Sequence, residues 1–449
     1  MISSLKRILN GVLLPVYLSI CLLLGGASTG GIIANTILQL LAVAILAYHF
    51  WAPSTETAIP KTKVILGLYW LIALYVCWTI VQMIPLPPSM WHALPGREFI
   101  ERGDAMLGMS DVWRPIAMQP DRAIISAMAI LPPFAMLVLT LRADRNARAA
   151  GLYALMAIAI LSSIIGLIQI SHGADSPAYF YDITNRNTSV GFFSNSNHLG
   201  MLFLIALVFT SDLPFRDVPD RSKLFWLAVR TGLMLFMLVN VLINRSFAAY
   251  VLLIPALAFW FARTKLAKRF FGQTKTLIAG LFIILSCLCL VGFTWGARLL
   301  DHLTLNSTSV SERLRFLDNT GKLIADTIPV GSGLGSFRWL YAGNESLAAV
   351  TRTYVNHAHN DYAEFLTEGG FFAVILFGGL IGWLGWRLWS MLRAEARYLG
   401  YCYAAPIVIL LVAGHSLVDY PVRTAAIAAI CGMCLGFLAK PDLIRRAVR

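Results

Sequence analysis

Charged residues are scarce in this chain. Asp, Glu, Lys and Arg together make up 13% of its 449 residues, whereas hydrophobic residues make up 58% and the mean hydropathy is +0.71. A water-soluble domain cannot bury that much apolar surface, so the composition excludes that class and indicates a protein that crosses a membrane several times. The apolar runs are about 20 residues long and do not alternate with polar residues, which favours helices over a β-barrel.

Cysteines and acidic residues are few as well. The seven cysteines lie in or beside apolar runs, so no disulfide framework is expected. Cys431 and Cys434 share one run and are interpreted as packing residues rather than a metal or redox site. Asp and Glu number 23 against 36 Lys and Arg, which gives a net charge of +13. Because the basic residues mostly lie between the apolar runs, we attribute them to topology and anionic membrane lipid, not to nucleic acid.

Twelve apolar segments are long enough to be membrane spans. They are residues 9–26, 31–50, 64–86, 123–141, 149–171, 198–212, 224–243, 247–262, 276–296, 371–389, 402–418 and 424–439. The sequence therefore predicts an all-α polytopic membrane protein with about 12 transmembrane helices. It divides into helices with short loops (1–296), one large loop (297–370), and the last helices with a basic tail (371–449).

The basic residues also predict an orientation. If the N-terminus with Lys6 and Arg7 is cytoplasmic, every expected connection on that side is basic, as the positive-inside rule requires. Both termini are then cytoplasmic and the large loop lies outside. A shorter outer segment, 87–122, is expected to lie at the membrane interface through Trp91 and Trp113.

The large loop has a helical pattern followed by a glycine-rich stretch. Apolar residues recur at helical spacing from Val310 to Ile324, and Pro329 is the expected stop. VGSGLGSF, residues 330–337, lacks the Lys-Ser/Thr pair and the preceding strand of a nucleotide site. We therefore interpret it as a tight turn.

The loop ends in HAHNDYAEFLTEGG, residues 357–370, where titratable groups meet an apolar run. An imidazole such as His359 can accept a proton near neutral pH. A zinc site from His357, His359, His198 and Asp361 is an alternative, although the spacing matches no common zinc pattern. Arg245 closes a tight hairpin between two apolar runs, where it either snorkels to the interface or meets an anion.

Several arginines and one base on the outer side suit group transfer from a lipid-linked pyrophosphate. Pyrophosphate is already a good leaving group, and arginine pairs can hold its developing charge. The acceptor alcohol gains from a base such as His359. Such a donor is activated in advance, so the reaction needs no nucleotide on the outer side.

The same residues resemble the signature of the O-antigen ligase and polysaccharide polymerase superfamily. In HNDYAEFLTEGGFFA (359–373), His359, Asn360 and Gly370 match the signature, whereas Ala373 departs at its last position. Four further stretches agree with the family in order: VGFFSNSNHLG (190–200), NRSFAAY (244–250), SERLRFLDNTGKLIADTIPVGSGLGSF (311–337) and HSLVDYPVR (415–423). In the hairpin stretch only Arg245 matches in place.

The resemblance implies a GT-C-like transmembrane glycosyltransferase of the bacterial inner membrane that works without a metal or other cofactor. Such enzymes move a glycan from an undecaprenyl-pyrophosphate donor to a sugar hydroxyl on the periplasmic side. Carried over, His359 is the base, and Arg245 and Arg313 bind the pyrophosphate. Further substrate-binding candidates are Asn197, His198, Arg315, Asn360, Asp361 and Arg423.

The sequence leaves the acceptor open. A ligase would use lipid A–core, a polymerase would use another undecaprenyl-linked glycan, and a protein-glycosylating relative is a third option. A transporter or flippase of lipid-linked or polysaccharide substrates is the alternative of a different class. It would predict charged, broken helices near the bilayer midplane and repeated halves, and the sequence shows neither pattern.

Overall fold

The computed structural model describes residues 2–28, 33–51, 59–213, 223–264, 308–347, 350, 354–394 and 398–442. Nearly all of its regular structure is helical. The elements are α1 (Ile2–Leu24), α2 (Ile33–Trp51), α3 (Lys63–Met83), β1 (Pro85–Leu86), α4 (Pro88–Trp91), α5 (Glu98–Met106), β2 (Arg114–Pro115), α6 (Pro120–Met128), α7 (Leu131–Arg142), α8 (Arg145–His172), η2 (Gly173–Asp175), α9 (Ser196–Thr210), α10 (Lys223–Asn244), α11 (Phe247–Thr264), α13 (Thr308–Thr327), α14 (Phe337–Asn344), α15 (Asp361–Gly369), α16 (Phe371–Arg393), α17 (Gly400–His415), η5 (Pro421–Arg423) and α18 (Ala425–Ala439).

These helices confirm the prediction of an all-α polytopic membrane protein. Seven of the described helical segments are long and apolar enough to cross a membrane, and four shorter apolar helices accompany them. Eleven of the twelve expected spans coincide with these segments. The expected span 276–296 lies outside the described residues, so the count of twelve stays a prediction.

One expected span, 123–141, is two helices in the structure. α6 ends at Met128, and α7 begins at Leu131 with two prolines at its start. Because proline has no backbone N–H to donate, Pro132 and Pro133 fit the first turn of a new helix but not the middle of a continuous one.

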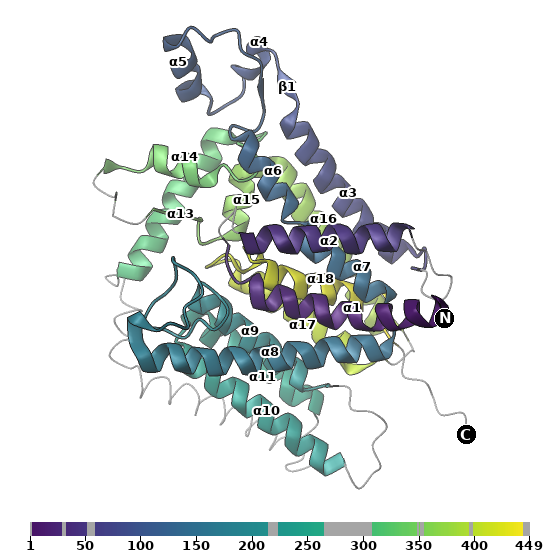
Figure 1. The fold of residues 1–449 in the computed structure, drawn as a ribbon. Coiled ribbons are helices and arrows are strands. Elements are labelled where there is room, and N and C mark those ends of the chain that lie inside the picture. The colour runs from purple at the N-terminus through teal and green to yellow at the C-terminus, as the bar shows by residue number, and fades with distance from the viewer. Residues whose placement is uncertain are drawn as a thin grey trace.

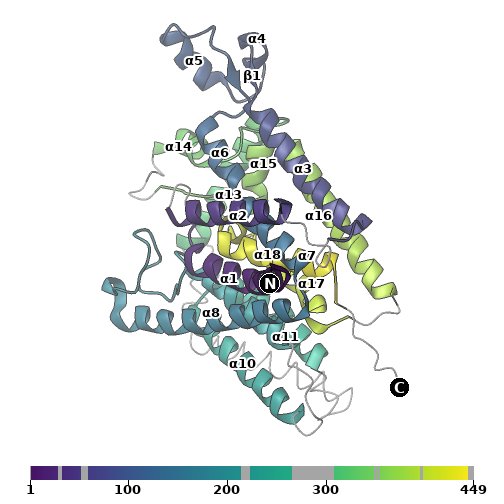
Figure 2. The ribbon, with the colours of Figure 1, turned by 45° about the vertical axis from the view of Figure 1, so that its right-hand side comes forward.

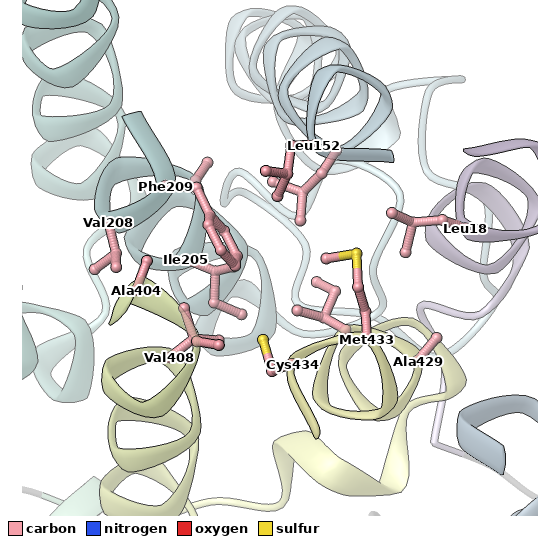
Figure 3. Close-up of a cluster of buried hydrophobic side chains, with 14 of the residues drawn as sticks. Leu18, Leu152, Ile205, Val208, Phe209, Ala404, Val408, Ala429, Met433 and Cys434 are labelled. Carbon is pink, nitrogen blue, oxygen red and sulfur yellow. The ribbon is translucent and has the colours of Figure 1, made fainter. Parts of the chain in front are cut away.

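The centre of the bundle is α9. Every residue from His198 to Thr210 is buried, because α9 packs against α8, α10, α11 and α17. Figure 3 shows Ile205, Val208 and Phe209 of this helix facing side chains of α8, α17 and α18. A helix that is apolar on all sides is thus enclosed by other helices rather than exposed to lipid.

Among the described helices, α7 and α18 pack together along an extensive surface. A Cβ added at Gly432 would lie 2.2 Å from the Pro133 carbonyl oxygen, and one at Gly436 would lie 2.6 Å from the Thr140 side chain. Glycine at these two positions lets the backbones approach, as small residues do between membrane helices. α18 in turn contacts α1 and α17, so the C-terminal helices lie inside the bundle (Figure 1).

Candidate active site

The site is built where α15, η5 and the start of α9 meet. Asn360 caps α15: its side-chain oxygen accepts from the Ala363 N–H at 2.9 Å, and its Nδ2 donates to the Leu417 carbonyl at 3.0 Å. The Asp361 N–H donates to the Ser416 carbonyl at 3.0 Å. These bonds join the loop before α15 to the segment after α17, which is why residues far apart in the sequence lie together.

His359 faces a buried carboxylate. Its Nδ1 lies 3.2 Å from Oδ1 of Asp419, and its ring stacks on Phe316 of α13 with centroids 5.7 Å apart. The side chain is 26% exposed, whereas that of Asp419 is fully buried. A carboxylate at Nδ1 favours the tautomer with the proton on Nδ1, which leaves the Nε2 lone pair able to accept a proton.

The backbone of His359 is in the left-handed region, with φ of +52°. A non-glycine residue adopts this conformation only where its surroundings hold it there. Here the Asn360 cap, the Asp419 contact and the Phe316 stack supply that restraint. The imidazole is therefore positioned before any substrate arrives.

Asp419 is held by several partners. Its Oδ2 accepts from Asn197 Nδ2 at 2.7 Å and lies 3.9 Å from His415 Nε2. Burial alone would raise the pKa of the Asp419 carboxyl, but the His359 hydrogen bond and the neighbouring imidazoles hold this pKa well below its usual range. Asp419 is thus an ionised partner that can stabilise a protonated His359.

A second buried cluster lies beside the first and centres on Arg423. The Arg423 guanidinium lies 3.5 Å from Asp361, 3.3 Å from Glu364 and 3.4 Å from Glu368. Glu364 also contacts His357 Nδ1 at 2.8 Å. Arg423 is therefore surrounded by three buried carboxyl groups.

The three carboxyl groups respond differently to this environment. Burial raises the pKa of Asp361 to about 7, despite the opposing effect of Arg423. Burial would also raise the pKa of Glu364, but Arg423 and His357 together hold this pKa below its usual range. Burial raises the pKa of Glu368. Glu364 is accordingly the ionised partner, and the other two carboxyls bind protons more readily.

The ring of Tyr420 separates the two clusters. It lies 4.4 Å from the His357 ring, 5.0 Å from the His359 ring and 5.2 Å from the His198 ring, between centroids. His198 is buried, and it contacts the site through this ring and the charge of Asp419. The structure thus brings His198, Asn197, Asn360, Asp361 and Arg423 together around His359.

The predicted pyrophosphate ligands lie on different elements, Arg313 on α13 and Arg245 at the turn between α10 and α11. Arg313 and Arg315 are half-buried on α13, the helix that carries Phe316, and the positive charge of Arg313 reaches Tyr420. The Arg315 guanidinium lies over the Phe316 ring, 5.7 Å from its centroid. Both arginines therefore belong to the helix that covers His359.

Arg245 forms the turn between α10 and α11. Its backbone has φ of +66° and its side chain is exposed. The residues on either side of it, Asn244 and Ser246, pack against Gly200 in the first turns of α9. Asn197 belongs to the same part of α9, so the hairpin and the Asp419 cluster adjoin the same helix start.

The glycine-rich stretch is a tight turn, as the sequence predicts. Gly331, Gly333 and Gly335 all have positive φ. The backbone N–H groups of Ser332 and Gly333 donate to the carbonyls of Thr367 and Glu368, both at 3.0 Å. Because these donors are used within the protein, the turn fixes α15 and is not a phosphate cradle.

The zinc alternative finds no support in the described residues. Nowhere in this part of the chain are three or more His, Cys, Asp or Glu side chains arranged to hold a metal ion. His357 and His359 each turn Nδ1 toward a different carboxylate, Glu364 and Asp419 respectively.

The comparison with known families concerns the same segment. Residues 232–378 match the family model described as O-antigen ligase. This match supports the resemblance of the segment to the O-antigen ligase and polymerase superfamily. The match covers 147 of the 449 residues (378 − 232 + 1) and includes Arg245, Arg313 and His359. No curated protein matches the chain.

Together with the apolar helices, the match suggests a multi-pass membrane protein with an activity of the glycan ligase or polymerase type. The sequence analysis missed two groups of residues at this site. Asp419 lies inside the HSLVDYPVR stretch that carries part of the resemblance. An acidic residue in that stretch was the feature of the sequence that could have identified it as a site residue. Glu364 and Glu368 follow Asp361 along one face of α15, at spacings of three and four residues.

Proposed function

We propose that the protein transfers a glycan from an undecaprenyl-pyrophosphate donor to a saccharide hydroxyl at the periplasmic face of the inner membrane, in O-antigen or surface polysaccharide assembly. The observation that carries the proposal is the His359–Asp419 pair. It combines a positioned imidazole, a buried ionised carboxylate and a covering helix with two arginines. A GT-C-like, metal-independent glycosyltransferase fits this arrangement.

In this proposal His359 Nε2 accepts the proton of the acceptor hydroxyl. The acceptor oxygen forms a bond to the anomeric carbon of the donor, and the bond from that carbon to the pyrophosphate oxygen breaks. The electron pair leaves with undecaprenyl pyrophosphate, and Asp419 stabilises the imidazolium that His359 becomes. Arg245 and Arg313 hold the charge that develops on the leaving group.

Arg423 has a different role in this proposal. Its guanidinium is surrounded by Asp361, Glu364 and Glu368, so a phosphate there would meet three acidic groups. We therefore assign Arg423 to fixing α15 against η5, which positions the loop that carries His359. Asn197 and Asn360 act likewise through Asp419 and the helix cap.

The position of the charges favours the enzyme over a transporter. Within the described residues, the Asp419 and Arg423 clusters lie at the ends of α9, α17 and α18. Alternating access instead needs substrate-binding groups near the middle of broken helices.

Glycan analysis of a deletion strain tests the proposal. The strain would carry the wild type, His359→Ala, or the control His172→Ala, whose exposed imidazole ends α8 away from the site. Loss of glycan transfer in His359→Ala alone, at equal membrane abundance, supports the proposal. A wild-type glycan profile in His359→Ala would overturn it.

The same analysis identifies the acceptor. Single repeat units that accumulate on the lipid carrier would indicate a polymerase. Long chains that remain on the carrier, together with unmodified lipid A–core, would indicate a ligase. Normal lipopolysaccharide with an unglycosylated protein would indicate the protein-glycosylating type.

A further inference from the structure

Residues 85–115 form a small folded unit at the end of α3, here named the α5 unit. β1 pairs with β2 in antiparallel fashion, and Trp91 is buried, with Nε1 donating to the Pro115 carbonyl at 2.8 Å. Arg114 Nε donates to the Asp104 carboxylate at 2.6 Å. In both ribbon views the unit projects from the helical bundle (Figures 1 and 2). The interfacial prediction is therefore wrong for Trp91, which is a core residue of this unit.

The unit leaves large apolar side chains outside its own core. Phe99 is 82% exposed, Met106 87%, Leu107 73% and Trp113 62%. Phe99 and Met106 are seven residues apart and share one face of α5. Arg102 lies between them on that face. So many exposed apolar residues in one short segment are not left facing water in a stable protein.

The helices before and after the α5 unit indicate what covers its exposed apolar side chains. α3 ends at Met83 and the segment α6–α7 begins at Pro120, and both are candidate membrane spans. The unit is thus tethered at both ends to helices that enter the bilayer. Its apolar face is accordingly held at the level where hydrocarbon meets headgroups, the region that amphipathic segments with Trp, Phe and Leu occupy.

We propose that the α5 unit lies on the bilayer surface, with Phe99, Met106, Leu107 and Trp113 inserted among the lipid headgroups. Arg102, on the same face as Phe99 and Met106, then lies at the depth of the lipid phosphates. The partner is the membrane lipid itself. The lipid contact of the α5 unit does not depend on transferase activity.

The unit also holds the loop that carries the site. Arg97 is buried and donates through Nη2 to the carbonyls of Ile116 at 2.8 Å and Gly331 at 3.0 Å. The Met118 N–H donates to the Ser332 carbonyl at 2.9 Å. Since the Gly331–Ser332 turn is bonded to α15, lipid contact by the unit sets the height of α15 above the bilayer. This consequence for positioning rests on the proposed function.

Lipid quenching tests the contact directly. A fluorescent amino acid would be placed at position 99, 107 or 101 of the full chain in lipid nanodiscs, with and without brominated lipids. Glu101 is the matched control, because it is on α5 but turned away from the Phe99 face. We expect several-fold stronger quenching at 99 and 107 than at 101. Equal quenching at the three positions, or cross-linking of position 99 to a second copy, would overturn the proposal.

A second measurement addresses the positioning role. In the variant Phe99→Ser/Leu107→Ser, we expect several-fold slower glycan transfer in nanodiscs and an unchanged thermal midpoint in detergent, because both side chains are exposed. An unchanged rate in nanodiscs would overturn the positioning role. If the chain proved to have no transferase activity, the quenching result would still stand, so the two failures are distinguishable.

Discussion

At the scale of single residues, the site depends on one long-range pair. His359 and Asp419 are 60 residues apart and meet because η5 folds back on the loop before α15. The left-handed backbone of His359 has a conformational cost of about 1 kcal/mol or more. A residue kept in this conformation by three separate contacts is better explained by function than by stability.

Asp419→Asn tests the pair. Asparagine keeps the shape but removes the charge that stabilises protonated His359, and its amide can favour the wrong tautomer. We expect the transfer rate of the purified protein to fall by about 10²- to 10⁴-fold, the range for a base and its orienting carboxylate. Asp182→Asn, an exposed acid of another loop, is the control. An unchanged rate in Asp419→Asn would contradict this role.

Asp361 gives a prediction for pH dependence. Its pKa is 3.8 without the protein environment and about 7 in the fold, so between these values folding takes up a proton. Stability contributed by neutral Asp361 is therefore present at low pH and is lost as pH rises toward 7. We expect the thermal midpoint to fall between about pH 5 and 7, and to fall less in Asp361→Asn.

Asp361 titrates beside other polar and charged groups, so the comparison of the two pH profiles needs a control variant. Arg423, Glu364, His357 and Ser416 face Asp361 from η5, α15, its preceding loop and the end of α17. Asp318→Asn, at an exposed position of α13, should leave the pH profile unchanged. If Asp361→Asn also followed the wild-type profile, the inferred protonation would be wrong.

At the scale of elements, α15 is held in place by the segments that adjoin its two ends. It is capped by Asn360 at one end and stops at Gly370, whose φ of +59° and ψ of −146° suit only glycine. A Cβ at Gly370 would lie 2.1 Å from the Pro329 carbonyl oxygen. The glycine thus permits the close contact between the glycine-rich turn and the junction of α15 with α16.

Gly370→Ala should therefore disrupt the site loop. We expect a marked loss of folded protein in the membrane, measured by size-exclusion chromatography of the detergent-solubilised variant. Gly378→Ala in α16 is the matched control, because a Cβ there meets nothing within 4 Å. Normal yield and normal activity in Gly370→Ala would show that the backbone at this junction tolerates a side chain.

At the scale of the whole molecule, the bundle has two polar ends. α9 joins them: Asn197 at its start meets Asp419, and Asp212 just past its end accepts from Arg263 at 2.6 Å. Arg148 and Asp442 pair at the same end as Asp212. The site and these ion pairs are thus on opposite sides of the apolar core.

Cysteine accessibility checks this arrangement. In a cysteine-free background, we expect a membrane-impermeant maleimide to label Asn344→Cys on α14 in intact cells once the outer membrane is permeabilised. Arg145→Cys, exposed at the start of α8, should react only after lysis, because it belongs to the expected cytoplasmic side. Labelling of both positions in intact cells would refute the orientation.

Sequence patterns predicted the helices and the loop motif but not the contacts among polar groups. Apolar runs report local burial, so α3 and α16 could be placed from them. The partners of His359 could not, because Asp419 reaches it through the packing of α17 against α9. Trp91 and Trp113 have the same side chain in one segment, yet the β1–β2 pairing encloses the first and leaves the second exposed.

The short helices beneath the site have a consequence for where the chemistry takes place. α9 and α18 have 15 residues each and α17 has 16, which makes them about 22–24 Å long. A bilayer's hydrocarbon core is about 30 Å thick. If their ends at the Asp212–Arg263 and Arg148–Asp442 pairs lie at one lipid surface, these helices alone do not reach the other. The segments that carry His359 and Asp419 then complete the distance, and under the proposed function a lipid-anchored phosphate would meet them at that second surface.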